Sequence, residues 1–160
     1  MKFYKMTFAL LLLLVVSLGL AGCKDIIIGG EASQESVQEI SIDVDIREKM
    51  FIGQVQDIYL NANDYMDKAI RLEGMFLSVT FGDMTYYSVL RYGPGCCGND
   101  GEIGFEVYWD NTAIKRPTDG DWVEAIGRLE RYDEYGVTYL HLNLSSLQVL
   151  PERGELNVLQ

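Results

Sequence analysis

Two adjacent cysteines in a glycine-rich segment are the residues of this sequence with the clearest chemical potential. Cys96 and Cys97 are followed closely by Asp100, and His141 is the one histidine of the chain. Thiolate, carboxylate and imidazole groups are ligands for zinc and copper. Adjacent residues of a straight strand point to opposite faces, so both sulfur atoms could reach one metal only where the backbone turns, which neighbouring glycines allow. These four residues are therefore a candidate zinc or copper site.

The cysteine pair also allows two interpretations without a metal. In an oxidising compartment Cys96 and Cys97 could form a vicinal disulfide, although the geometry of such a bond is strained. The two small side chains could instead simply pack a loop beneath a barrel. Metal sites usually place cysteines in a C-x-x-C spacing rather than side by side. The chemistry of this pair stays open between the three interpretations.

Arg91 and His141 are expected to have structural rather than catalytic roles. Arg91 could form a structural ion pair with Asp100 or with a carboxylate of the core. His141 lies between Leu140 and Leu142 in a strand-like run, and no serine or aspartate stands beside it in the sequence. The sequence also has no phosphate loop, nucleophile elbow or zinc-protease helix motif. We therefore expect a protein that is not an enzyme.

The N-terminus has the features of a lipoprotein signal. Lys2 and Lys5 precede an apolar run over residues 7–20, which is shorter than the about 20 apolar residues that span a membrane. The run ends in Leu-Ala-Gly-Cys, which resembles the lipobox. We expect residues 1–22 to be cleaved and Cys23 to carry a diacylglycerol lipid and palmitate. Such a lipid would anchor the chain on the extracytoplasmic face of the cell membrane.

The chain is strongly acidic, which limits the partners it can have. Its 24 Asp and Glu against 13 Lys and Arg give a formal net charge of −11. This charge repels phosphate backbones, so nucleic acid is not expected as a partner. Cations and basic proteins fit it better.

Composition divides the chain into a signal, a tether, one domain and a tail. After the signal at 1–22, residues 23–41 are mostly small and polar without a period, as in a flexible lipidated tether. We expect an OB-like domain over 42–152 and a C-terminal tail over 153–160. At the start of this domain, the alternation around Val44 predicts either a short edge strand or the end of the tether.

The pattern of apolar residues predicts one helix followed by five strands. Apolar residues at helical spacing predict an amphipathic helix over 49–62, and the period becomes two from Ala69 onward. Gly74 and Gly127 interrupt two of the strand patterns, which is typical of coiled strands in a closed barrel. We therefore expect an all-β fold with a small α contribution, an OB-like barrel, with a sandwich or open sheet as the alternative. The predicted strands begin near Ala69, Thr85, Ile103, Trp122 and Val137.

Tyrosines in these strands are candidates for a ligand-binding face. OB barrels stack ligands on aromatic side chains. The candidates are Tyr86, Tyr87, Tyr108 and Tyr139.

A longer pattern within 51–151 resembles a known family. Arg91, the Cys-Cys-x-x-Asp segment at 96–100, the strand at 104–107 and the acidic-Trp-Val strand at 121–127 follow one another as in the C-terminal domain of the YcgQ-like family. That family consists of uncharacterised, membrane-associated bacterial proteins. The resemblance implies a gene neighbour encoding a predicted permease and, for some members, a link to metal homeostasis. Its usual members have N-terminal transmembrane helices, which a lipid anchor replaces here.

The sequence thus predicts a membrane-anchored, non-enzymatic accessory or binding module. The resemblance implies a membrane permease or another envelope protein as its partner. The alternative is a metal-binding or redox-active protein that uses Cys96 and Cys97.

Overall fold

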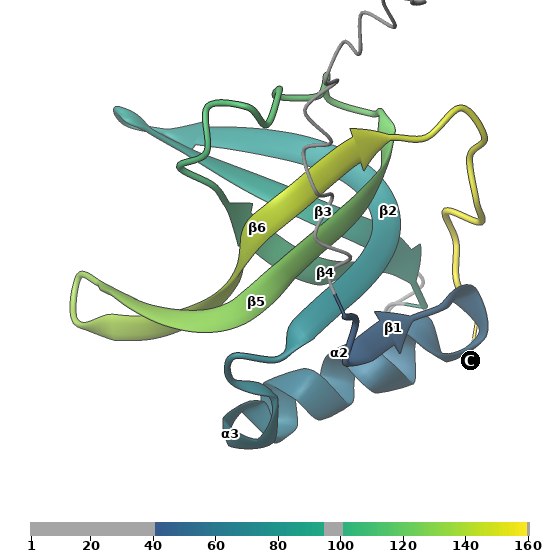
Figure 1. Ribbon diagram of the computed structural model, residues 1–160, viewed down its shortest axis with the longest axis horizontal. Coiled ribbons are helices and arrows are strands. Elements are labelled where there is room, and N and C mark those ends of the chain that lie inside the picture. The colour runs from purple at the N-terminus through teal and green to yellow at the C-terminus, as the bar shows by residue number, and fades with distance from the viewer. Residues whose placement is uncertain (1–40, 95–100, 160) are drawn as a thin grey trace, which may run out of the picture. The chain divides into compact units, whose positions relative to one another are not determined.

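The computed structural model describes residues 41–94 and 101–159 (Figure 1). The expected signal at 1–22, the lipidated Cys23 and nearly all of the tether lie outside the described residues, as do Cys96, Cys97 and Asp100. Within the described part of the chain, no helix has the length and apolar character needed to cross a membrane.

The order of elements follows the sequence prediction, with an additional short strand at the start. A 3₁₀ turn, η1 (Glu48–Met50), leads into α2 (Phe51–Leu60) and α3 (Ala62–Tyr65), where one helix over 49–62 was expected. The edge strand considered around Val44 is present and runs parallel to the first barrel strand. The strands are β1 (Val44–Ile46), β2 (Ala69–Phe81), β3 (Met84–Gly93), β4 (Gly101–Tyr108), β5 (Trp122–Glu134) and β6 (Val137–Val149).

Five strands close into a barrel, which confirms the expected OB-like fold. The strands are hydrogen-bonded in the order β2-β3-β4-β6-β5, and β5 also pairs with β2. All of these pairs are antiparallel except β4 with β6. The β2–β3 and β5–β6 hairpins both project on the same side of the barrel (Figure 1).

Glycines allow the long strands to coil around the barrel, as the sequence predicted. β2 pairs with β5 from Ala69 to Met75 and with β3 from Met75 to Phe81, so the change of partner falls beside Gly74. A Cβ atom at Gly74 would lie 2.8 Å from the carbonyl oxygen of Leu90. Gly127 stands at the register shift between β5 and β6. Side chains at these positions would prevent the close approach of the strands that closes the barrel.

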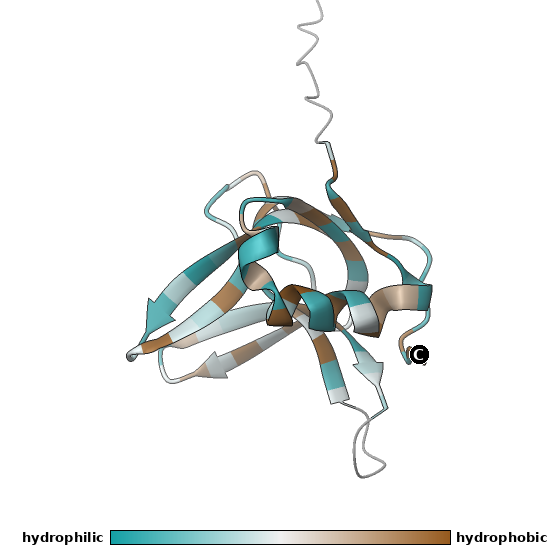
Figure 2. Ribbon diagram, turned by 90° about the horizontal axis from the view of Figure 1, so that it is seen from below, coloured by the Kyte–Doolittle hydropathy of each residue, from teal (hydrophilic) through white to brown (hydrophobic). Residues whose placement is uncertain are grey.

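Helix α2 covers the core with its apolar face. Phe51, Ile52, Val55 and Ile58 recur at helical spacing and are buried, whereas the residues between them are mostly exposed. Figure 2 shows the corresponding brown and teal segments alternating along the helix. The barrel side of this core is buried and consists of Ile70, Leu72, Phe76, Val89, Phe105, Val107, Val123, Ala125, Leu129, Leu142 and Leu144.

The residues after β6, expected as a tail, return to the barrel. The backbone N–H of Tyr92 donates to the carbonyl of Leu156 at 2.8 Å, and the N–H of Val158 donates to the carbonyl of Tyr92 at 2.8 Å. Val158 is 3% exposed and contacts the core cluster. This C-terminal segment therefore takes part in the packing of the domain.

Candidate functional site

Arg91 lies buried near the end of β3, where its guanidinium joins four segments of the chain. Its Nε donates to the carbonyl of Glu73 at 2.8 Å, and its Nη1 donates to the carbonyl of Glu155 at 3.1 Å. The guanidinium carbon lies 4.9 Å from the ring centre of Phe51 and 4.8 Å from that of Trp122. With 2% of its surface exposed, Arg91 connects β2, α2, β5 and the C-terminal segment.

The charge of Arg91 is only partly balanced by a carboxylate. Its Nη1 lies 3.9 Å from Oε2 of Glu48, which is half exposed. Burial lowers the pKa of Arg91, and nearby carboxylates, Glu48 first, oppose this shift. The ion pair expected with Asp100 stays a prediction, because Asp100 lies outside the described residues.

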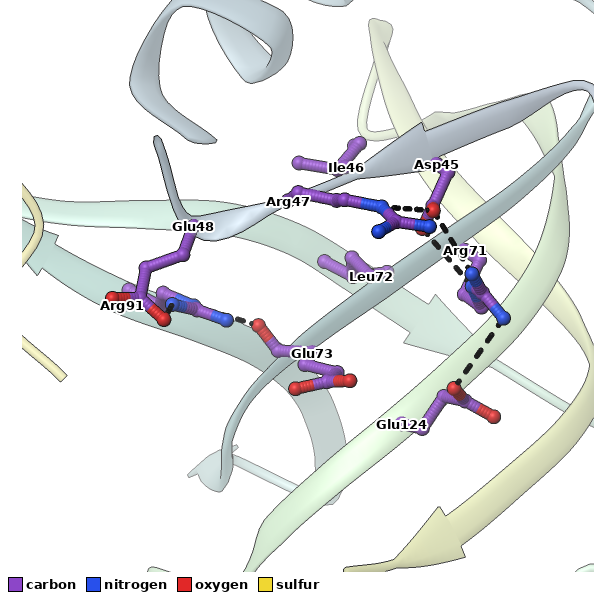
Figure 3. A pocket seen from close by; sticks show the side chains of 9 residues that line it. All are labelled: Asp45, Ile46, Arg47, Glu48, Arg71, Leu72, Glu73, Arg91 and Glu124. Carbon is purple, nitrogen blue, oxygen red and sulfur yellow. Dashed lines mark hydrogen bonds and ion pairs between the residues drawn. The ribbon is translucent and has the colours of Figure 1, made fainter. Parts of the chain in front are cut away.

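Beside Arg91, a pocket of about 330 Å³ lies between β1 and the barrel (Figure 3). The Nε and Nη2 atoms of Arg71 donate to the two carboxylate oxygens of Asp45 at 3.0 and 2.9 Å, and Arg47 contacts the same carboxylate. The hydrogen bond from Arg71 is the main cause that lowers the pKa of Asp45. Each arginine of the pocket thus already has an oxygen of the protein as its partner, and the pair of Arg71 with Asp45 holds β1 against β2. The lining residues are Asp45, Ile46, Arg47, Glu48, Arg71, Leu72, Glu73, Arg91 and Glu124.

His141 lies on the outer wall of the barrel in a stack of aromatic rings. Its ring centre is 4.8 Å from that of Tyr132 and 5.6 Å from that of Tyr108. Its Nε2 is 3.7 Å from Oε2 of Glu130. The described residues contain no group of three or more potential metal ligands. A site that joins His141 to the cysteines stays a prediction, because both cysteines lie outside those residues.

The stack belongs to a larger surface, which we call the hairpin face. Directly paired residues of neighbouring strands share a face of a sheet. Such pairs are Val79 with Tyr86, Phe81 with Met84, Glu106 with His141, Glu130 with His141, Tyr132 with Tyr139, and Glu134 with Val137. Contacts between strands join these pairs into one surface. The hairpin face consists of Val79, Phe81, Met84, Tyr86, Glu106, Tyr108, Glu130, Tyr132, Glu134, Tyr135, Val137, Tyr139 and His141.

Two tyrosine hydroxyls fix carboxylates of the hairpin face. Tyr86 donates to Oε1 of Glu134 at 2.8 Å, which joins the two hairpins near their turns. Tyr132 donates across β6 to both oxygens of Glu106, at 2.9 and 2.8 Å. The bond to Glu134 is the main cause that raises the pKa of Tyr86 to about 12, and burial followed by the Glu106 bond raises the pKa of Tyr132. Both hydroxyls are therefore protonated donors near neutral pH.

Exposed apolar side chains concentrate on the hairpin face. Of the twelve large apolar residues that are exposed in the described chain, seven belong to it. Phe81 and Tyr135, at the two hairpin turns, are 81% and 91% exposed. Tyr135 has a φ of 49°, in the left-handed region, within the β5–β6 turn. Contiguous exposed apolar patches of this kind are typical of interaction sites on protein surfaces.

Of the tyrosines proposed from the sequence for a ligand face, three lie on the hairpin face. Tyr86, Tyr108 and Tyr139 lie there, whereas Tyr87 does not. Tyr87 points to the other side of β3, where its ring centre is 5.8 Å from that of Phe76 and 4.9 Å from that of Trp109. Alternation along β3 separates the two neighbouring tyrosines in this way.

Sequence reasoning missed several members of the hairpin face. The carboxylates of Glu106, Glu130 and Glu134 and the ring of Tyr132 were not singled out. The sequence did contain a signal for them. In each predicted strand they alternate with apolar core residues, so they must lie on the outer face of the barrel.

The closed barrel and the hairpin face define a small OB-like β-barrel domain with an exposed aromatic and acidic surface. The chain belongs to the DUF1980 family, since residues 30–152 match the model of the DUF1980 C-terminal domain. This match supports, at the level of that family, the relationship expected from the sequence. No match was found among curated proteins. The family domain is one of unknown function, so function has to be argued from the site.

Proposed function

We propose that this protein is a non-enzymatic accessory module that binds a partner protein through the hairpin face. The observation that supports the proposal is the concentration of exposed apolar residues around hydrogen-bonded tyrosines. A membrane permease, or another envelope protein, is the partner that the resemblance to the YcgQ-like family implies. The lipid on Cys23 would hold the module beside it, on the extracytoplasmic face of the cell membrane.

The chemistry of the hairpin face favours binding over catalysis. A general base is most effective when its pKa lies near the operating pH. The pKa of Tyr86 is raised to about 12, and that of Tyr132 is also raised. These hydroxyls serve as donors that hold carboxylates in place, as in a preorganised binding surface.

The lipid anchor is tested by Cys23→Ser. Membrane affinity grows with each buried methylene group, by about 0.8 kcal/mol, so loss of the acyl chains should remove most of it. We expect the wild-type chain in the membrane fraction, labelled by a palmitate analogue, and the variant unlabelled. An equal membrane share and equal labelling of both proteins would contradict the anchor.

The binding surface is tested by the double variant Phe81→Ser/Tyr135→Ser. Both side chains are almost fully exposed, so the free energy of unfolding should change by less than about 0.5 kcal/mol per site. Aromatic side chains dominate binding energy, so association with the neighbouring permease in membranes should weaken about tenfold or more. Quantitative co-isolation from cells with a tagged permease measures this.

Leu60→Ser is the matched control for this double variant. Leu60 is 82% exposed but lies at the end of α2, outside the hairpin face. Its replacement should leave the association unchanged. Equal losses in the control and the double variant, or none in either, would contradict a binding role for the hairpin face.

The second candidate function is metal binding or redox chemistry at Cys96 and Cys97. Gly93 and Gly101 are paired across β3 and β4, so one short connection carries both cysteines and Asp100. Elemental analysis and a thiol count on the purified chain, prepared without chelator, test this candidate. Near-stoichiometric zinc or copper that the Cys96→Ser/Cys97→Ser variant lacks would support it. Absence of metal, with the two cysteines either free or joined in a vicinal disulfide, would contradict it. The accessory role would then be the only candidate of the two that remains.

A further inference from the structure

The carboxylates of the hairpin face indicate which chemistry its partner presents. We propose that the partner segment docked on the hairpin face carries a lysine or arginine whose cationic group lies among Glu106, Glu130 and Glu134. This inference rests on the proposed function and specifies the chemistry of its site.

These three carboxylates accept hydrogen bonds from hydroxyl and amide groups. Glu106 accepts from the hydroxyl of Tyr132 and Glu134 from that of Tyr86. Glu130 accepts from the amide nitrogen of Asn143 at 3.2 Å and lies 3.7 Å from Nε2 of His141. Across residues 41–94 and 101–159, no lysine or arginine nitrogen lies within 4.0 Å of any of the three. Their negative charge therefore lacks a lysine or arginine partner within this part of the protein, and a histidine lies beside Glu130 alone.

Other carboxylates of the same domain do have such partners. Asp45 contacts Arg47 and Arg71, and Glu124 lies 3.9 Å from Arg71. The hairpin face differs from the pocket at β1 in this respect. A surface that combines apolar side chains with unbalanced carboxylates is complementary to a partner that combines apolar and basic ones.

The register of the strands places two of the carboxylates on either side of an aromatic ring. His141 is paired with Glu106 on β4 and with Glu130 on β5. Directly paired residues have Cβ atoms about 5 Å apart, so the two carboxylates flank the stack that Tyr108, His141 and Tyr132 form. A guanidinium or ammonium group seated there gains charge-assisted hydrogen bonds and contacts with tyrosine rings.

The apolar part of the hairpin face favours a protein over a membrane or a glycan. Val79, Met84 and Val137 are aliphatic or thioether side chains, and methionine and aromatic residues are enriched at protein interfaces. Asp83 and Asp133 stand beside the two hairpin turns. Together with the net charge of −11, they repel anionic headgroups.

The experiment begins with the full lipidated chain in its own cells. A photoreactive phenylalanine analogue is placed at Phe81, and separately at Tyr139, and the crosslinked peptides are sequenced. The sequence recovered from both positions is then synthesised, once unchanged and once with each lysine and arginine replaced by norleucine. Binding of both peptides to the purified chain is measured by calorimetry, for the wild type and for Glu106→Gln/Glu134→Gln.

Glutamine keeps an oxygen that accepts from each tyrosine hydroxyl, so this variant removes the charges and preserves the contacts between strands. We expect either the norleucine peptide or the double variant to weaken binding about tenfold, with little further loss when both are combined. Glu152→Gln, an exposed carboxylate after β6, is the matched control and should bind as the wild type does.

Two results would overturn the inference, and they can be told apart. If the norleucine peptide binds as tightly as the unchanged peptide, the partner's basic residue does not contribute to binding and the inference is wrong. The proposed function would still hold, because a protein segment would still bind the hairpin face. Crosslinks to lipid, to glycan or to a second copy of this chain alone would overturn the proposed function as well.

Discussion

Arg91→Leu is expected to destabilise the domain by about 3 kcal/mol or more. The substitution leaves the carbonyls of Glu73 and Glu155 without the donors that they have in the wild type. Both hydrogen bonds are partly buried, and a hydrogen bond that involves a charged group contributes about 1.5–3 kcal/mol. The faces of Phe51 and Trp122 also lose the cation between them. Urea unfolding followed by tryptophan fluorescence and circular dichroism measures the change.

Two further substitutions show whether the loss of stability is caused by removal of the buried guanidinium. Arg91→Lys keeps the charge but lacks the planar fork that reaches two carbonyls, so we expect a loss of intermediate size. Arg71→Gln removes an arginine that is 34% exposed from the same pocket and should cost about 1 kcal/mol or less. A stability of Arg91→Leu within about 0.5 kcal/mol of the wild type would contradict the structural role of Arg91.

Gly104→Ala is expected to be almost as damaging, by about 2–4 kcal/mol, or to prevent folding. A Cβ atom at this position would lie 2.1 Å from the carbonyl oxygen of Val89 and 2.6 Å from the Cα of Leu90. Both neighbours are backbone atoms of β3, so only separation of the paired strands relieves the overlap. That separation also disturbs the carbonyl of Gly104, which accepts from the hydroxyl of Tyr59 at 3.1 Å.

Gly53→Ala is the control for this substitution and is expected to stabilise the domain slightly. Gly53 lies in α2, and a Cβ atom there meets nothing within 4 Å. Alanine favours a helix over glycine by about 0.5–1 kcal/mol, so this variant should be slightly more stable than the wild type. Thermal unfolding of both variants by circular dichroism decides the matter. A melting temperature of Gly104→Ala equal to that of the wild type would contradict the close approach of β3 and β4.

The barrel could be predicted from the sequence because its elements depend on local patterns. The period of two from Ala69 onward gave the strands, and the helical spacing after Phe51 gave the helix. Gly74 and Gly127 marked the positions where the strands coil, so a closed barrel was favoured over an open sheet. These signals require only neighbouring residues, which a sequence displays directly.

The site could not be predicted to the same extent, because its contacts depend on which strands become neighbours. Tyr132 reaches Glu106 only because β6 lies between β5 and β4 and pairs with both. Tyr86 reaches Glu134 because the two hairpins project on the same side of the barrel.

The partners of Arg91 were also beyond the sequence. Two of them are backbone carbonyls. Every residue has a backbone carbonyl, so the residue types do not indicate which ones accept from Arg91. One belongs to Glu155, in a segment that the pattern presented as a tail. Long-range packing of this kind has to be seen in the fold.

The central claim, that the hairpin face binds the partner protein, is tested most directly by a hydrogen–deuterium exchange footprint of the complex. The full chain is compared in detergent with and without the purified permease that we propose as its partner. The account predicts slower amide exchange on complex formation in the segments 80–87 and 132–140, with unchanged exchange in β1 and α2. Protection confined to β1 and the pocket around Arg71, with none in the two hairpins, would contradict it.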